Sequence, residues 1–267
     1  MTTLAWLVEA GADEAVADTP VNRLTAKPSA PAAQVPVTPR AAGSRPAPSS
    51  PPSSTGSDAI GDAMKVAATA RSLAELKAAM EAFEGSALKR GATNTVFADG
   101  TPSGRVMFIG EAPGRDEDRV GKPFVGRAGQ LLDKMLASID LDRGRNCYIT
   151  NVINWRPPDN RDPSPEEAAI CLPFLRRHIE LANPGLIVLL GAVAARHVMG
   201  VTEGIMRTRG RWLEYRVGSA MVPVMPTLHP AYLLRQPAHK KLAWRDLQAV
   251  ASRMEALGLP EPAVRVS

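Results

Sequence analysis

The sequence predicts an α/β fold, a three-layer α/β/α sandwich around a central, mainly parallel four-stranded sheet. The first observation is that short apolar segments alternate along the chain with longer segments of helical spacing. Apolar strands joined by helices form parallel sheets that are covered on both faces. The second is that the 267 residues are 45% hydrophobic and 22% charged, which is enough apolar material for a packed core.

Four strands are expected, because each is a short apolar run bounded by glycine, proline or asparagine. They lie at residues 105–110, 146–154, 185–191 and 221–230. In open parallel sheets, ligands bind beyond the carboxyl ends of the strands. Functional residues are therefore expected directly after Ile109, Ile153, Leu190 and Met225.

Five helices are expected from capping residues and apolar spacing. Ser72 precedes a helical segment and Glu75 follows three places later, which is the pattern of a capping box. Ser164 and Pro165 are typical of an N-cap and a first helical position. The predicted helices cover residues 72–83, 127–139, 164–182, the segment that starts at 192, and 238–257.

The composition divides the chain into three parts. Residues 1–26 contain a segment of helical spacing and are interpreted as a short N-terminal helix that packs on the body or binds a partner. Residues 27–58 are rich in proline, serine and alanine, and they are predicted to be a disordered linker because they cannot bury enough apolar surface. The globular domain is expected at residues 59–262.

Charge and cysteine content limit the function classes. The net charge is +5, and from Arg176 to Ser267 there are 13 Lys/Arg and 6 Asp/Glu, which is typical of a surface facing a polyanion or of a solvated basic face. Two cysteines, Cys147 and Cys171, cannot form a disulfide framework, so a cytoplasmic location is expected. No apolar run approaches the roughly 20 residues that span a bilayer, so no membrane partner is expected.

The segment after the first predicted strand reads GEAPGRDEDRVGKPFVGRAGQLL. Its glycines expose backbone amides and allow close approach of a ligand. Glu111 places a carboxylate at the mouth of the sheet, with loop bracing as the alternative role. Phe124 is a candidate platform for a flat ring, with a plug under the loop as the alternative. The acidic residues 116–118 are interpreted as solvated or structural.

Two further segments follow strand ends. Asn151 and Asn154 offer amides that match the adjacent donor and acceptor of a pyrimidine edge, with support of the loop backbone as the alternative. His229 precedes a proline and therefore lies in an extended or turn conformation. The apolar tip 232–234 is flanked by cations, a combination that suits a wedge in a base stack or simple packing onto the body. The flanking cations are Arg235, Lys240 and Lys241.

Five motifs in this order resemble a family 4 uracil-DNA glycosylase. The resemblance covers roughly residues 72–257 and rests on the glycine-rich segment quoted above and on four shorter motifs: ITNV, RPPDNRDPSPEE, LGAVA and TLHPAYLLR. It implies the same three-layer fold and a glycosylase that hydrolyses uracil from DNA without cutting the strand. It also implies that no covalent intermediate accumulates, because the loop RPPDNRDPS contains no histidine.

The resemblance also assigns roles to residues. Glu111 and His229 are expected to be catalytic: Glu111 would hold the attacking water, and His229 would donate to uracil O2. The implied uracil-binding residues are Gly110, Ala112, Phe124 and Asn151. The expected DNA-binding residues, which include basic candidates for phosphate contacts, are Pro230, Tyr232, Leu233, Arg235, Arg209 and Lys240.

Members of this family hold a 4Fe–4S cluster through four cysteines, and the present chain departs from that pattern. At the corresponding positions it has Phe83, Ser86, Trp155 and Cys171, so only one thiolate remains. A single thiolate cannot hold such a cluster. The chain is therefore expected to work without a cofactor or metal, with Phe83 and Trp155 filling the volume as apolar packing.

The expected partner is uracil-containing DNA, bound by a monomer, with a possible protein partner at the N-terminal segment. Two other readings remain open at this point. One is a non-catalytic protein on the same fold that binds damaged or single-stranded DNA, and the missing cysteines favour it. The other is a glycosylase for another deaminated base such as hypoxanthine, against which Asn151 favours uracil.

Overall fold

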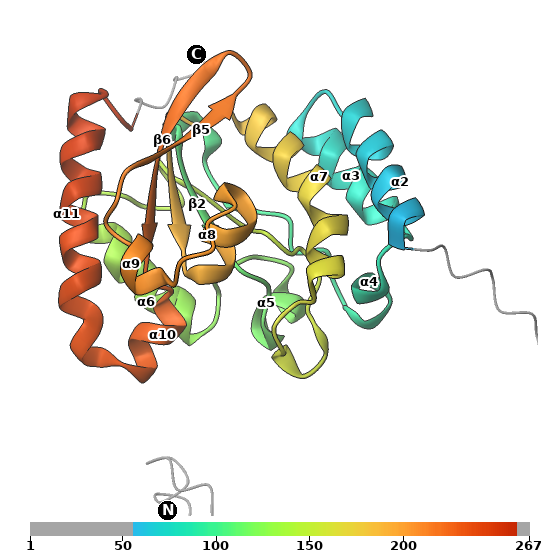
Figure 1. Ribbon diagram of the computed structural model, residues 1–267, viewed down its shortest axis with the longest axis horizontal. Coiled ribbons are helices and arrows are strands. Elements are labelled where there is room, and N and C mark those ends of the chain that lie inside the picture. Colours follow the sequence, from blue (N-terminus) through green and yellow to red (C-terminus); the bar gives the residue numbers. More distant parts are fainter. Residues whose placement is uncertain (1–55, 261–267) are drawn as a thin grey trace, which may run out of the picture. The chain divides into compact units, whose positions relative to one another are not determined.

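The computed structural model describes residues 56–260, and a six-stranded sheet lies at its centre (Figure 1). The predicted N-terminal helix 1–26 and most of the predicted linker 27–58 lie outside the described residues. Helix α2 begins at Gly56, so residues 56–58, which were assigned to the linker, belong to a helix. None of the helices in the described part is long and apolar enough to cross a membrane.

The sheet has the strand order β1-β3-β2-β4-β6-β5. Its four central strands are parallel and confirm the predicted α/β class: β3 (Tyr148–Asn151), β2 (Val106–Gly110), β4 (Leu186–Leu190) and β6 (Ala220–Thr227). The count of four was too low, because β1 (Asp99–Gly100) and β5 (Leu213–Val217) pair antiparallel at the two edges. One has two residues and the other is largely half-exposed, so neither has a continuous apolar run.

Helices cover both faces of this sheet, and the predicted caps are confirmed. Ser72 Oγ accepts a hydrogen bond from the Glu75 amide at 3.1 Å, and Ser164 Oγ accepts from the Glu167 amide at 3.1 Å. The helices are α2 (Gly56–Thr69), α3 (Leu73–Ala82), α4 (Ala87–Gly91), α5 (Arg115–Val120), α6 (Arg127–Ala137), α7 (Pro165–Ala182), α8 (Ala192–Met199), α9 (Ile205–Thr208), α10 (Pro230–Arg235) and α11 (Lys240–Ala256), with short 3₁₀ turns η1 (Pro102–Gly104), η2 (Pro158–Asn160) and η3 (Pro237–His239).

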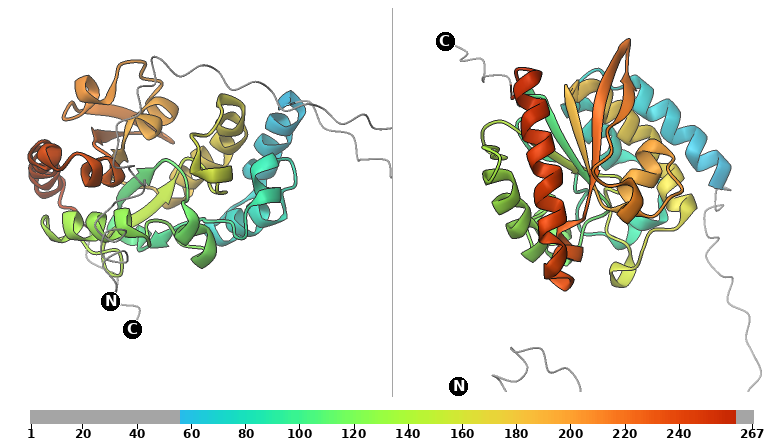
Figure 2. Two further views of the ribbon diagram at one scale, coloured as in Figure 1. Left: turned by 90° about the horizontal axis from the view of Figure 1, so that it is seen from below. Right: turned by 60° about the vertical axis from the view of Figure 1, so that its left-hand side comes forward.

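Two hydrophobic cores form because successive residues of a strand point to opposite faces. In β2, Met107 and Ile109 contribute to the core beneath α2, α3 and α7, whereas Val106 and Phe108 contribute to the core beneath α6 and α11. Figures 1 and 2 show the sheet between these two helical layers. The three-layer arrangement predicted from the sequence is therefore present.

The parallel register brings the functional strand ends to one edge of the sheet. Gly110 of β2 is paired with Asn151 of β3, and Leu190 of β4 is paired with Thr227 of β6. His229 follows two residues after that threonine. Helices α5 and α10 lie beyond this same edge (Figure 1). Residues that are far apart in the sequence therefore converge at the carboxyl ends of the parallel strands.

A buried ion pair fixes the loop after α9 to the final helix. Asp246 of α11 is 2% exposed and accepts hydrogen bonds from Arg209 Nε at 2.9 Å and from Thr227 Oγ1 at 2.6 Å. The same guanidinium also donates to the backbone carbonyl of Leu242. The prediction that Arg209 contacts DNA phosphates is therefore wrong, because its guanidinium is already paired with Asp246 inside the protein.

We expect Arg209→Ala to lower the free energy of unfolding by about 3–5 kcal/mol, because it leaves the Asp246 carboxylate buried without its cation. Urea denaturation followed by circular dichroism measures this change. Arg211→Ala is the matched control, because Arg211 forms an exposed pair with Glu203 and should cost at most about 1 kcal/mol. Equal effects of the two substitutions would contradict the structural role of Arg209.

Candidate active site

A cavity of about 240 Å³ opens at the carboxyl edge of the sheet, and both predicted catalytic residues line it. Glu111 comes from the end of β2, and His229 is the N-cap of α10. Of the other predicted residues, Ala112, Tyr232 and Arg235 also line this cavity. The structure therefore brings together groups that the sequence separates by more than a hundred residues.

Gly110, Asn151 and Phe124 form a second group that does not line this cavity but adjoins it through Glu111 and His229. A Cβ atom at Gly110 would lie 2.4 Å from Asn151 Oδ1 and 2.4 Å from the ring of Phe124, so both side chains occupy the space that glycine leaves free. The rings of Phe124 and His229 have their centroids 5.5 Å apart. Asn151 Oδ1 is buried and has no hydrogen-bond partner within residues 56–260. An unpaired buried acceptor is costly, and a ligand donor would satisfy it.

The backbone of Phe124 is held in an unfavourable conformation. Its φ of +54° lies in the left-handed region, which costs a residue with a side chain about 1–2 kcal/mol. Arg143 Nη2 donates to the Phe124 carbonyl at 2.8 Å, and Glu117 Oε1 accepts from the amides of Val125 and Gly126. These bonds hold the backbone of the loop at Phe124 in place, and such maintained strain is typical of functional positions.

The hydrogen bonding of His229 defines which ring nitrogen can donate. His229 Nδ1 accepts a hydrogen bond from the Ala231 amide at 3.1 Å, so in the neutral ring the proton is on Nε2. Burial, with a smaller contribution from Arg235, lowers the pKa of His229 to about 4. The imidazole is therefore neutral at pH 7 and has one N–H donor that is not used by the backbone.

Glu111 has a pKa above its ordinary value. Burial is the larger cause, and the nearby carboxylate of Asp162 adds to it, whereas Arg196 and Arg235 act in the opposite direction. Asp162, which is not among the site residues predicted from the sequence, also lines the cavity. Its position in the loop after the second strand motif was the available signal. A carboxylate of raised pKa beside a neutral donor is suited to proton transfer from water.

Several polar residues near the site have structural roles. Glu117 accepts from the amides of the Phe124 loop, and Asp118 accepts from the amides of Thr93 and Asn94 at 2.8 and 3.1 Å. These contacts give Glu117 and Asp118 structural roles, whereas Asp116 forms an exposed ion pair with Arg119 at 3.8 Å. Asn154 donates to the Val96 carbonyl at 3.0 Å, so of the two asparagines only Asn151 has an unsatisfied oxygen.

The predicted apolar tip is a short helix, α10, and its exposed residue differs from the one expected. Leu233 is 1% exposed and packs in the core with α6 and α11, so the prediction that it contacts DNA is wrong. Its neighbour Leu234 is 37% exposed. Pro230 is buried at the first helical position, and the Tyr232 hydroxyl is 2.7 Å from His239 Nδ1. A helical period, rather than the alternation of an extended loop, decides which leucine reaches the surface.

The side chains at the predicted cluster positions do not fit a 4Fe–4S cluster. Phe83 and Trp155 stack with ring centroids 6.5 Å apart, and Phe174 contacts both rings edge-on. Cys171 belongs to the same buried core, and burial raises the pKa of its thiol to about 12. Ser86 is buried with an unpaired hydroxyl. Across residues 56–260, no three His, Cys, Asp or Glu side chains gather as metal ligands.

Comparisons with known proteins agree with this geometry. The sequence profile of the uracil DNA glycosylase superfamily matches residues 97–248. A type-4 uracil-DNA glycosylase of Thermotoga maritima is 41% identical over 169 residues, which cover 62% of this chain and 86% of that protein. A type-4 enzyme of Archaeoglobus fulgidus is 41% identical over 174 residues, with 64% and 85% covered. A type-5 uracil-DNA glycosylase of Pyrobaculum aerophilum is 34% identical over 148 residues, with 50% and 64% covered.

We expect the His229 imidazole to titrate near pH 4 in the folded chain, as measured by NMR of the labelled ring. Because an unfolded histidine titrates near 6.5, the unfolded state binds the proton first, and stability falls as the pH is lowered from about 6.5 towards 4. Arg235→Ala should raise the pKa only slightly, because burial is the larger cause. A midpoint near 6.5 in the folded protein would contradict a desolvated, neutral imidazole.

Proposed function

Because the chain belongs to the uracil-DNA glycosylase superfamily, we propose that it removes uracil from DNA by hydrolysing the bond between the base and the sugar, leaving an abasic site. The observation that carries this proposal is the buried, unpartnered Oδ1 of Asn151, which lies beside the ring of Phe124. A flat base that presents an N–H group would satisfy both at once. The type-4 relatives named above give the substrate class.

Recognition of the flipped base rests on Asn151 and Phe124. The amide oxygen of Asn151 accepts from uracil N3–H, and its amide group donates to O4. The ring of Phe124 stacks on the pyrimidine, and the missing side chain at Gly110 leaves room for both residues. Backbone groups of Gly110 and Ala112 complete the pocket. A site built to hydrogen-bond one edge rejects bases that leave its buried groups unpaired.

The reaction requires stabilisation of negative charge on the leaving base and activation of a water molecule. Cleavage of the N1–C1′ bond leaves the electron pair on uracil, and His229 Nε2–H donates to O2 as that charge develops. Glu111 accepts a proton from the water that attacks C1′. Because His229 is neutral at pH 7, the donor is an uncharged imidazole N–H, and Nδ1 remains free to accept from the Ala231 amide.

Extrusion of the nucleotide has a cost of a few kcal/mol, which contacts from α10 offset. We assign the wedge to Leu234, which is exposed where Leu233 is not. Tyr232 and Arg235 line the cavity mouth, and Lys240 is exposed at the start of α11. Cations in these positions suit the phosphates that flank the flipped nucleotide.

The proposal includes catalysis without an iron–sulfur cluster, with the aromatic cluster of Phe83, Trp155 and Phe174 as the structural substitute. Apolar burial of aromatic rings stabilises the same part of the fold that metal–thiolate bonds would otherwise hold together. We further propose that the chain acts as a cytoplasmic monomer and that residues 1–26 provide a contact for a protein partner. Iron-free catalysis, the cytoplasmic monomer and the protein contact are proposals that membership of the superfamily does not by itself imply.

We expect His229→Ala to lower kcat for uracil release by about 10²–10³, the range for loss of one donor to a developing anion. Asn151→Ala should lower it by about tenfold or more, because a buried hydrogen bond to the base is lost. The acid limb of the pH profile should follow the raised pKa of Glu111 and disappear in Glu111→Gln. Single-turnover assays on a uracil-containing oligonucleotide measure these changes.

His197→Ala is the control for His229, because His197 is a partly buried histidine on α8 that does not line the cavity. The expected product is an abasic site in an intact strand. Unchanged activity of both His229→Ala and Asn151→Ala would reject the proposed site. Release of another base in preference to uracil from a panel of damaged oligonucleotides would reject the proposed substrate.

Protein purified without air is expected to contain less than stoichiometric iron and sulfide, as measured by elemental and sulfide analysis. Trp155→Ala should lower the free energy of unfolding by about 3–5 kcal/mol, because it opens a cavity in a fully buried cluster. Trp155→Phe, which retains an aromatic ring, should cost less. One cluster equivalent per chain would refute the iron-free assignment.

A further inference from the structure

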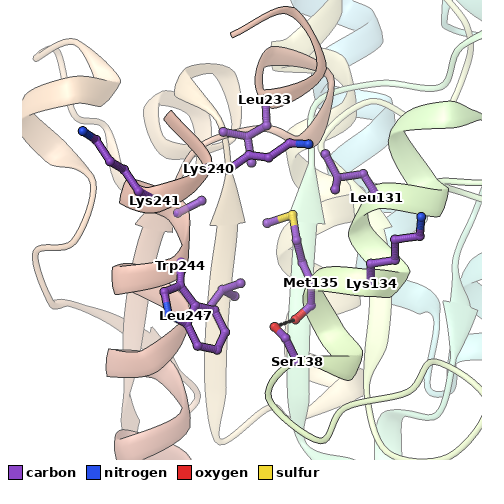
Figure 3. A pocket seen from close by; sticks show the side chains of 10 residues that line it. Leu131, Lys134, Met135, Ser138, Leu233, Lys240, Lys241, Trp244 and Leu247 are labelled. Atoms are coloured by element: carbon purple, nitrogen blue, oxygen red, sulfur yellow. Dashed lines mark hydrogen bonds between the residues drawn. The ribbon is translucent and has the colours of Figure 1, made fainter. Parts of the chain in front are cut away.

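An apolar groove lies between α6 and α11, apart from the cavity that contains Glu111 and His229. Its volume is about 460 Å³. Figure 3 shows side chains of the two helices facing each other, with Met135 on one wall, Trp244 on the other, and Lys240 extending from α11 towards Leu131. The floor includes Leu247 and Ala243. Of the residues that line this groove, only Lys240 has a role in the proposed uracil release, as a phosphate contact.

The groove continues to helix α10. A neighbouring cavity of about 240 Å³ shares three lining residues with it, namely Leu131, Lys134 and Lys240, and adds Leu234 and Arg127. The exposed leucine of α10 therefore lies at one end of the combined groove and Trp244 at the other. The opposite side of α10 borders the active-site cavity through Tyr232 and Arg235.

The combined groove is cationic at its rim and apolar inside. Its basic residues make no ion pair within the described part of the chain, and no Asp or Glu lines either cavity. Trp244 is 43% exposed and is the one aromatic among the large exposed hydrophobic residues between positions 56 and 260. The basic residues are Arg127, Lys134, Lys240 and Lys241.

We propose that this groove binds the unpaired DNA strand next to the extruded uracil, with a base stacked on Trp244 and phosphates held by Lys134 and Lys241. Stacking of a base on an exposed aromatic ring is tolerant of sequence, and unpaired lysines supply the cations for the backbone. Continuity with α10 gives the strand a path from the active site. This inference rests on the proposed function and adds a preference for single-stranded substrate.

An acidic amphipathic peptide is the rival occupant of such a groove. Residues 4–17 of this chain contain Glu9, Asp13 and Glu14 among apolar residues and would be complementary in charge. Two features favour nucleotides over a peptide. The groove lies beside α10, which contacts DNA in the proposed function, and its exposed indole offers a flat surface on which a base can stack. Binding of this peptide in place of DNA is therefore one outcome that the test distinguishes.

The test compares uracil release from single strands of 5 and 21 nucleotides, each with a central uracil, by the full chain. The 5-mer leaves only about two nucleotides on each side of the uracil to occupy the groove, whereas the 21-mer leaves about ten. In the wild type kcat/KM should be higher for the 21-mer, and Trp244→Ala should reduce the ratio of the two values about tenfold through KM. Trp244→Phe should restore most of it.

Binding of a uracil-free 21-mer, followed by fluorescence anisotropy at several salt concentrations, gives a second readout. Lys134→Ala should weaken binding and reduce the salt slope by about 0.7, the value for one phosphate contact to a single strand. Arg245→Ala is the matched control, since Arg245 is an exposed cation of α11 that does not line the groove, and it should leave the slope unchanged.

Wild-type behaviour of both Trp244→Ala and Lys134→Ala on the 21-mer would overturn the inference. Selective binding of a peptide would also overturn it. In that case a peptide of residues 1–26 would bind the wild type but not Trp244→Ala, and the two proteins would bind DNA equally well. Failure of the wild type to release uracil from either strand would instead reject the proposed function, and the anisotropy measurement would still report on the groove.

Discussion

The absence of a side chain at Gly110 is the constraint on which the active site depends. The parallel register pairs Gly110 with Asn151, and any Cβ at this position would occupy the space of the Asn151 oxygen and the Phe124 ring. The strained backbone of Phe124 is tolerated because Arg143 and Glu117 hold the loop on both sides of it. The sheet therefore sets the position of the Asn151 amide relative to the Phe124 ring, and the loop only completes this arrangement.

This dependence explains how far sequence reasoning could go. Strand ends such as Gly110 and Asn151 were predictable, because apolar runs and their terminating residues are local signals. The exposure of Leu234 instead of Leu233 could not be predicted from the sequence. It depends on the formation of α10, a helix of six residues, in a segment that begins with His-Pro. The engagement of Arg209 by Asp246 was equally hidden, because the two residues are 37 positions apart and meet only in the folded chain.

The aromatic cluster illustrates a different relation between sequence and structure. The substitutions at Phe83 and Trp155 could be read directly from the chain, but their consequence depends on packing. The two rings stack and share Phe174 as a neighbour, and the remaining thiol of Cys171 stays protonated because it is fully buried. The positions that the resemblance assigns to cluster ligands are thus occupied largely by buried side chains that contact one another, and close packing of this kind supports the sheet and its loops.

The same principle of burial governs the chemistry at His229. The imidazole lies against Gly191, and a Cβ atom added at Gly191 would lie 3.0 Å from the Cβ of His229. The Nδ1 atom of His229 accepts a hydrogen bond from the Ala231 amide. Desolvation keeps the ring neutral, the nearby Arg235 cation acts in the same direction, and the backbone bond leaves Nε2 as the donor. An exposed imidazole would alternate between charged and neutral forms near pH 6.5 and between two tautomers. Close packing beneath α10 thus determines the position of the donor, its protonation state and its tautomer together.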